Sequence, residues 1–150
     1  MDEYFMNFAL DEACKAYSAL EVPVGAIVVH KGKIIASGYN LRETLKDPTA
    51  HAEIIAIKKA SEYLGGWRLI DCTMYVTVEP CPMCAGAILN SRIDRLVIGA
   101  RDYKMGCCGT CLDLTNNPNF NHSVEVTFGV LEEECSSIMK RFFSELRKSK

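Results

Sequence analysis

The fold is decided by the stretch TMYVTVEPCPMCAGAILNS, residues 73–91. Its first six residues, Thr73–Val78, have the alternating pattern of a buried strand. Pro80 and Pro82 then mark a helix start, because proline suits the first turn of a helix. This helix is expected to run to about Ser91. The stretch therefore predicts a strand that leads directly into a helix, the unit from which α/β folds are built.

On both sides of this stretch, expected helices alternate with expected strands. Apolar residues at helical spacing predict a helix over residues 2–20, which Pro23 ends. The other expected elements are a hairpin of 22–29 with 33–37, a helix that begins at Asp47-Pro48-Thr49 and ends at Gly65-Gly66, strands over 95–100 and 124–128, and a closing helix over 131–147. This order predicts an α/β fold whose partly parallel sheet is covered by helices on both faces.

Length and composition favour one globular domain over residues 1–150, with 49% hydrophobic and 24% charged residues. No apolar run approaches the ~18 residues of a membrane span. The acidic start lacks the positive region of a signal peptide, so we expect a cytoplasmic protein without membrane partners. Residues 101–123 form a long Gly- and Asn-rich segment, and segments of this length are usually functional.

The net charge of -2 gives no overall sign of nucleic-acid binding, and its distribution along the chain is uneven. Residues 1–21 carry five acids and one lysine, whereas residues 138–150 carry five basic residues and one acid. The basic C-terminal segment has two interpretations. It is either the solvated face of a helix or one edge of a phosphate-binding surface.

Two short segments, His51-Ala52-Glu53 and Cys81-Pro82-Met83-Cys84, carry the chemistry, and each lies at an expected helix start. Cys81 and Cys84 are three residues apart, so both sulfurs face the same side of a first turn. His51 supplies a third ligand, and three protein ligands leave one tetrahedral position of a zinc ion open to water, as in catalytic zinc sites. We therefore expect one Zn²⁺ per subunit, held by His51, Cys81 and Cys84.

Glu53 follows the histidine ligand by two residues and is not needed to hold the metal. A carboxylate at this position can accept a proton from water and pass it to a substrate, so we interpret Glu53 as the catalytic acid and base. The combination of His-x-Glu with Pro-Cys-x-x-Cys is the known signature of zinc-dependent nucleobase deaminases.

Other interpretations of the same residues stay open at this point. The Cys-x-x-Cys pair is also typical of thioredoxin-like redox sites. A closed structural zinc would recruit a fourth ligand from Cys107, Cys108 or Cys111. These three cysteines are otherwise small hydrophobic side chains that pack a loop, or a redox-sensitive or second metal-binding segment. Cys14, Cys72 and Cys135 are expected to be thiols of the core, and Trp67 a packing residue.

Segments spread over about residues 20–145 resemble the bacterial tRNA-specific adenosine deaminases of the cytidine-deaminase-like superfamily. The resemblance lies in PVGA at 23–26, DPTAHAE at 47–53, WRL at 67–69, EPCPMCAGAI at 79–88, SRI at 91–93, GARD at 99–102 and FNH at 120–122. The zinc motif belongs to the whole superfamily, and the flanking segments narrow the resemblance to this branch.

The resemblance implies a three-layer α/β/α sandwich with a mixed five-stranded sheet. It also implies a hydrolase of a cyclic amidine C–N bond, which converts adenosine to inosine at wobble position 34 of a tRNA anticodon, with no DNA substrate expected. The enzyme would be a homodimer whose shared surface helps to form the RNA site. Deamination of a free base or nucleoside (guanine, cytosine or cytidine) and a non-catalytic zinc module that binds RNA are the alternatives.

The residues implied for substrate binding are Asn40, Asp102, Lys104 and His122. Asn40 matches an asparagine that contacts the target base, although an asparagine alone is often a turn residue. Asp102 and Lys104 match a loop that contacts the flanking nucleotides. Asp102 would accept a hydrogen bond from a sugar hydroxyl or a base edge, a contact that can distinguish RNA from DNA. His122 would contact phosphate or hold its loop.

Overall fold

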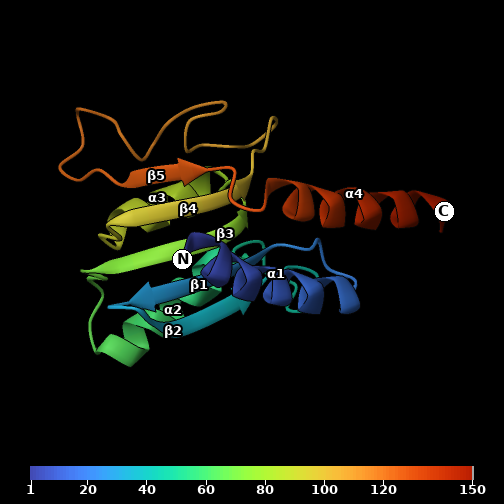
Figure 1. Ribbon diagram of the computed structural model, residues 1–150, viewed down its shortest axis with the longest axis horizontal. Helices are drawn as coiled ribbons and strands as arrows, with labels where there is room; N and C mark the ends of the chain where they lie inside the picture. The colour runs from blue at the N-terminus through green and yellow to red at the C-terminus, as the bar shows by residue number, and fades with distance from the viewer. Residues whose placement is uncertain (150) are drawn as a thin grey trace.

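The computed structural model describes residues 1–149 and contains a five-stranded sheet with helices on both faces (Figure 1). Its elements are α1 (Asp2–Ser18), β1 (Gly25–His30), β2 (Lys33–Tyr39), α2 (Ala52–Leu64), β3 (Cys72–Val78), α3 (Pro82–Asn90), β4 (Arg95–Ala100), β5 (Glu125–Phe128) and α4 (Glu132–Lys148). Both the type and the order of these elements confirm the sequence-based prediction.

The strands lie in the order β2-β1-β3-β4-β5. β1 is antiparallel to β2 and to β3, whereas β3–β4 and β4–β5 are parallel pairs. The predicted mixed sheet is therefore confirmed. In this arrangement the start of β1 and the ends of β2, β3 and β4 lie at one edge of the sheet. Loops at the carboxyl ends of parallel strands are where α/β proteins place their ligands.

Two apolar cores lie on the two faces of the sheet. The first is formed by α2 and α3 against β1, β3 and β4, and small alanines of α2 such as Ala56 and Ala60 allow the helix to approach the strands closely. The second is formed by α1 and the start of α4, with Phe5, Met6 and Cys135 packed on Tyr75 and Val97. These two cores make the three layers of the fold.

The antiparallel hairpin β1–β2 is held close to α1 by a glycine. A Cβ atom at Gly25 would overlap the carbonyl oxygen of Ala9 in α1 and would come 2.8 Å from the Cβ of Glu12. Only glycine permits the helix to lie so close to the start of β1. This contact fixes the position of the N-terminal helix over the strand that begins beside the functional site.

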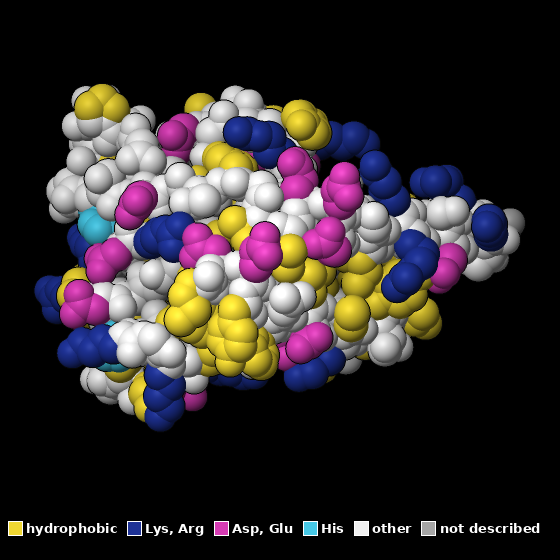
Figure 2. Space-filling view, viewed as in Figure 1, with side chains coloured by type: hydrophobic (Ala, Val, Ile, Leu, Met, Phe, Trp, Pro, Cys, Tyr) yellow, Lys and Arg dark blue, Asp and Glu magenta, His cyan; other side chains and the backbone are white. Residues whose placement is uncertain are grey.

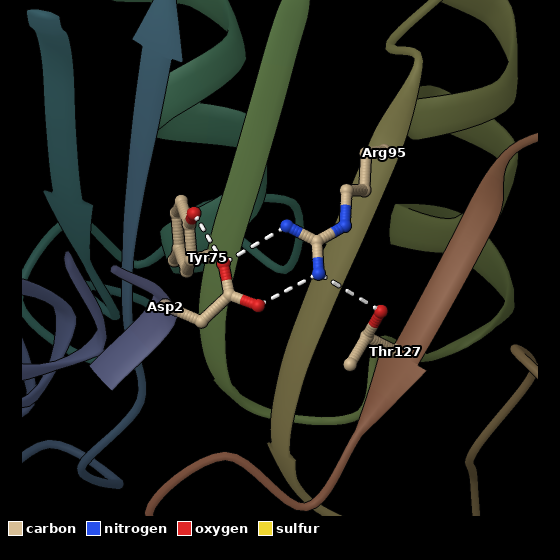
Figure 3. Close-up of polar contacts among 4 residues, drawn as sticks. All are labelled: Asp2, Tyr75, Arg95 and Thr127. Atoms are coloured by element: carbon tan, nitrogen blue, oxygen red, sulfur yellow. Dashed lines mark hydrogen bonds and ion pairs between the residues drawn. The ribbon is translucent and has the colours of Figure 1, made fainter. Parts of the chain in front are cut away.

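A polar network ties the start of α1 to the middle of the sheet (Figure 3). Arg95 of β4 donates from Nη1 and Nη2 to the two carboxylate oxygens of Asp2, at 2.9 and 2.7 Å. Tyr75 of β3 donates to the same carboxylate at 2.8 Å, and Thr127 of β5 accepts from Arg95 at 3.1 Å. The network joins four elements at the end of β4 opposite the carboxyl edge.

The predicted start of α2 is wrong by about four residues. Asp47 does not begin the helix. Its Oδ1 accepts hydrogen bonds from the amide and the hydroxyl of Thr49, at 2.8 and 2.7 Å. Aspartate and proline form such turns as readily as they cap helices. The turn delays α2 until Ala52, so His51 becomes its N-cap residue.

One further prediction about buried residues is wrong. Cys14 is exposed, because α1 directs only one side toward the sheet, whereas Cys72 and Cys135 are buried as expected. Trp67, expected to be a packing residue, is about half exposed (53%) and contacts the guanidinium groups of Arg68 and Arg92, which lie 4.3 and 5.7 Å from the centroid of its ring. None of the helices within residues 1–149 is long and apolar enough to cross a membrane.

Candidate metal centre and substrate cavity

The three expected metal ligands lie at the N-termini of two neighbouring helices. His51 is the N-cap of α2, and Cys81 is the N-cap of α3, both with extended backbone conformations. Pro82 occupies the first turn of α3, and Cys84 follows in the same turn. The backbone N–H groups and the helix dipole at such positions stabilise negative charge on sulfur.

The distances between the donor atoms fit a tetrahedral zinc ion. Nδ1 of His51 lies 3.7 Å from Sγ of Cys81 and 3.5 Å from Sγ of Cys84, and all three atoms lie within 4.8 Å of one another. Tetrahedral bonds of about 2.3 Å to sulfur and about 2.0–2.1 Å to nitrogen separate such ligands by about 3.6 Å. The residues present therefore match the size and the donor preference of zinc.

The pKa values of the two thiols also indicate a cation site. A hydrogen bond from Cys84, together with His51, lowers the pKa of Cys81 to about 4. The pKa of Cys84 is raised, because its proton is shared with the Cys81 thiolate and because it is buried. A divalent cation among the three donor atoms replaces this proton and permits both sulfurs to be thiolates.

The site is not a closed four-ligand centre. Within residues 1–149, only His51, Cys81 and Cys84 form a group of histidine, cysteine or acidic side chains suited to a metal. Cys107 and Cys108 are buried in the apolar core, and Cys111 is exposed. The fourth-ligand interpretation and the second metal site are therefore wrong for the described chain, whereas the interpretation of Cys107 and Cys108 as small hydrophobic residues is confirmed.

Glu53 lies beside the metal ligands in the first turn of α2 and is 3% exposed. Its Oε1 is buried and has no hydrogen-bond partner within the described residues. Burial raises the pKa of this carboxyl to about 7. A buried carboxylate oxygen without a partner is costly, and it is the arrangement expected for a group that exchanges protons with a bound water or substrate.

These residues line a cavity of about 270 Å³ at the carboxyl edge of the sheet. This volume is about nine times the ~30 Å³ that one water molecule occupies in the liquid, so the cavity has room for a small molecule beside the metal ligands. Its walls come from segments far apart in the sequence: Val22, Val24, Asn40, Arg42, His51, Ala52, Glu53, Val78, Glu79, Cys81, Asp102, Met105 and Met139.

Asn40 lines this cavity immediately after β2, and its side chain also braces the local backbone. Its Nδ2 donates to the carbonyl of Val22 at 3.2 Å, and its Oδ1 accepts from the amide of Arg42 at 3.1 Å. The same wall is held by Glu21, which is 1% exposed and accepts hydrogen bonds from the amides of Glu43 and Thr44. Asn40 is thus both a turn residue and a cavity residue.

Asp102 lines the opposite wall, in the segment that follows β4. Its Oδ1 accepts hydrogen bonds from the amides of Lys104 and Met105, at 3.0 and 3.1 Å. The side chain of Lys104 is exposed and is not among the residues that line the cavity. His122 lies elsewhere, with Nε2 3.0 Å from the carbonyl of Ile93, near the start of β4 and so at the opposite edge of the sheet. The structure therefore does not bring His122 to the metal centre.

Several cavity residues were not singled out in the sequence. Glu79 could have been found, because it lies between an apolar strand and Pro80, and a carboxylate in such surroundings is expected to be buried and hydrogen-bonded. Met139 could not have been found from the sequence, because it reaches the cavity from α4, more than fifty residues beyond the metal ligands.

The mixed sheet and the His-Cys-Cys centre beside a buried carboxylate define a class, that of the zinc-dependent deaminases. Residues 1–100 match the family of the cytidine and deoxycytidylate deaminase zinc-binding region. The tRNA-specific adenosine deaminase of Bacillus subtilis is 52% identical over 149 residues, which are 99% of this chain and 92% of the relative.

Solved structures agree with this match. A structure from a study of A-to-I editing by tRNA:A34 deaminases is 44% identical and superposes with a TM-score of 0.87, over 90% of this chain and 98% of the other. A guanine deaminase from Bacillus subtilis is 35% identical, with a TM-score of 0.66 over 97% and 93% of the two chains. This chain therefore belongs to the cytidine and deoxycytidylate deaminase family, in its branch of tRNA-specific adenosine deaminases.

Proposed function

We infer that this chain is a zinc-dependent hydrolase that deaminates adenosine to inosine at position 34 of a tRNA anticodon. The observation that carries this function is the 52% identity to a tRNA-specific adenosine deaminase over nearly the full length of both chains. The zinc centre alone does not distinguish the substrate, because the metal motif is common to deaminases of different bases.

His51, Cys81 and Cys84 would hold the zinc ion, which when bound would make a water molecule a stronger acid. We propose that Glu53 moves the protons of the reaction. Its free Oε1 accepts a proton from the attacking water and passes it to N1 of adenine. A second proton passes through the same oxygen to the departing amine. The water oxygen bonds to C6, the C6–N6 bond breaks, and inosine and ammonia are formed.

We propose that Asn40 and Asp102, which line two walls of the cavity, contact different parts of the substrate. Asn40 is the contact to the target base, since it lies in the same cavity as Glu53. Asp102, with Lys104 beside it, is the contact to the neighbouring nucleotides. An anticodon loop presents unpaired bases, so much of the unstacking cost of a few kcal/mol is already met. His122 stays a prediction as an RNA contact, now at a site away from the metal.

The basic part of α4 is a second surface that supports an RNA substrate. This helix projects beyond the sheet (Figure 1), and Lys and Arg side chains lie along its projecting end (Figure 2). Arg141, Arg147 and Lys148 are exposed there, whereas Ile138 and Phe142 face the protein. We propose that this exposed basic face contacts phosphates.

We also propose that the protein is a homodimer and that residues 1–150 act as one catalytic domain. The partly exposed apolar side of α3, with Met83 36% exposed, is the candidate shared surface. Sedimentation of the purified protein tests the dimer. A monomer at micromolar concentration would contradict it. A cytoplasmic location stays a prediction from the sequence.

One assay tests the substrate. Purified zinc-loaded protein is incubated with an adenosine-bearing anticodon stem-loop, and separately with adenosine, cytidine and guanine, while inosine and ammonia are measured. We expect inosine from the stem-loop alone. Turnover of guanine or of a free nucleoside without turnover of the stem-loop would contradict the proposed substrate and would favour deamination of a free base or nucleoside, as in the guanine deaminase relative.

A further inference from the structure

Glu79 is a second buried carboxylate at the cavity, and the reaction described above does not use it. It directly follows β3, is 2% exposed, and donates its amide to the carbonyl of Ala100 at 2.9 Å. This bond holds it between the ends of β3 and β4. The two ion pairs within residues 1–149, Lys15–Glu12 and Arg95–Asp2, do not involve it. Its polar partners within these residues are therefore hydrogen-bond donors alone.

All of these hydrogen bonds come from residues 102–110, the segment that we call the rim. Oε1 accepts from the amide of Asp102 at 3.1 Å and from the hydroxyl of Thr110 at 2.5 Å. Oε2 accepts from the amides of Cys108 and Thr110, both at 3.1 Å. One carboxylate thus receives four hydrogen bonds from both ends of the rim, and bonds to a charged acceptor are stronger than neutral ones.

The rim packs closely against this carboxylate. A Cβ atom at Gly106 would lie 2.5 Å from both Cδ and Oε1 of Glu79, so only glycine leaves enough space. The amide of Cys107 donates to the carbonyl of Pro80 at 3.0 Å, next to the metal ligand Cys81. Cys107 and Cys108 fill the apolar space below. The rim is therefore attached to the residues that lead into the metal centre.

The consequence concerns Asp102. One of its carboxylate oxygens, Oδ1, accepts the amides of Lys104 and Met105, whereas Oδ2 has no hydrogen bond within the described residues. The direction of Oδ2 depends on the backbone of Asp102, whose amide is held by Glu79. We propose that Glu79 is a positioning residue, which fixes the rim so that Asp102 presents a free carboxylate oxygen to the nucleotides flanking the target base.

This inference rests on the proposed function, so the experiment first measures turnover of the anticodon stem-loop by the wild-type protein. The variants are Glu79→Gln, Asp102→Asn and the double variant. Gln has the shape of Glu, but it turns an NH₂ group toward amides that are themselves donors. Glu12→Gln is the matched control, since Glu12 is also buried (6% exposed) but lies in α1, where it pairs with Lys15.

We expect Glu79→Gln to raise KM for the stem-loop by about 10- to 100-fold, the effect of a displacement of about 1 Å at a binding group. Zinc content should stay at one per chain. The double variant should have nearly the same KM as Glu79→Gln, because Asp102 is already misplaced. Hydrogen exchange of the amides in 102–110 should be faster in Glu79→Gln, a readout that does not depend on activity.

Three results would overturn the inference while leaving the proposed function intact. They are an unchanged KM, effects of the two substitutions that multiply, and unchanged hydrogen exchange of the rim. A wild-type protein that does not act on the stem-loop would instead contradict the proposed function. If Glu79→Gln does not fold, Thr110→Val removes one of the four hydrogen bonds and should raise KM in the same direction by a smaller factor.

Discussion

Two buried carboxylates lie at the cavity and are held in opposite ways: Glu53 in its floor, which we define as the metal ligands and Glu53, and Glu79 beneath the rim of residues 102–110. Glu53 in the floor has an oxygen without a partner and a pKa raised to about 7 by burial. Glu79 under the rim accepts four hydrogen bonds. An unsatisfied carboxylate is free to exchange protons, whereas a fully satisfied one holds backbone in place. The number of partners thus supports the proposed division between proton transfer by Glu53 and positioning by Glu79.

The largest effect is expected from Glu53→Gln, which removes proton transfer but preserves the size of the side chain. We expect kcat to fall by about 10³- to 10⁴-fold, the upper range for general acid–base catalysis, with zinc still at one per chain. Activity and metal content are measured on the same preparation. Glu62→Gln, at an exposed position of the same helix, is the control. A Glu53→Gln protein with wild-type kcat would remove the distinction between floor and rim.

The next effect is expected from loss of a metal ligand in the floor. Cys81→Ala should lower both zinc content and stability, because the free energy of metal binding is also free energy of folding. Zinc at about 1,000 times its Kd contributes about 4 kcal/mol, so the loss should be visible in thermal unfolding. Addition of EDTA to the wild-type protein should lower its Tm toward that of the variant. A Tm insensitive to EDTA would contradict a metal that stabilises the floor.

A smaller effect is expected from Gly106→Ala in the rim. The added methyl group would overlap the Glu79 carboxylate, and overpacking of this kind costs about 1–3 kcal/mol. We expect a lower Tm and a higher KM for the stem-loop, with kcat much less affected than in Glu53→Gln. Gly66→Ala is the matched control, because a methyl group there would meet no atom within 4 Å. A rim variant that loses zinc would show that rim and floor are one unit.

The smallest effect is expected at the network of Asp2 and Arg95 (Figure 3), neither of which lines the cavity. The hydrogen bond from Arg95 lowers the pKa of Asp2 below its ordinary value of 3.8. Its stabilisation is therefore present above that value and lost as the pH falls through the lowered pKa. We expect Asp2→Asn to cost less than about 1 kcal/mol at pH 7, since the pair is partly exposed.

Urea unfolding of both proteins between pH 7 and pH 3 measures this difference. The two stabilities should converge below about pH 4, the ordinary range of an aspartate, and KM should be unchanged at neutral pH. A difference that is constant with pH would show that the negative charge of Asp2 is not its source.

The order of the elements could be predicted because each one has a local signal, such as helical spacing in α1 or a proline in the first turn of α3. The start of α2 could not, because Asp47-Pro48-Thr49 is compatible with both a helix cap and a turn. Which of the two forms is decided by the tertiary structure, which places His51 at the start of α2 beside the two cysteines. Trp67 was expected only to be a packing residue, and the sequence did not indicate that it would pack on two arginines at the surface, because a single large side chain does not indicate which face of the fold it joins.

The sequence by itself identified the metal ligands, and the spacing of Cys81 and Cys84 in one helical turn places their sulfurs together through local geometry. The approach of His51 from the start of α2 to these sulfurs was decided by the tertiary structure. Only the tertiary structure decided the walls of the cavity. Asn40, Asp102 and Met139 come from segments that meet at one edge of the sheet, and pairing of distant strands is not encoded in any short stretch. The role of Glu79 depends on the same cause, since its four donors lie more than twenty residues away along the chain.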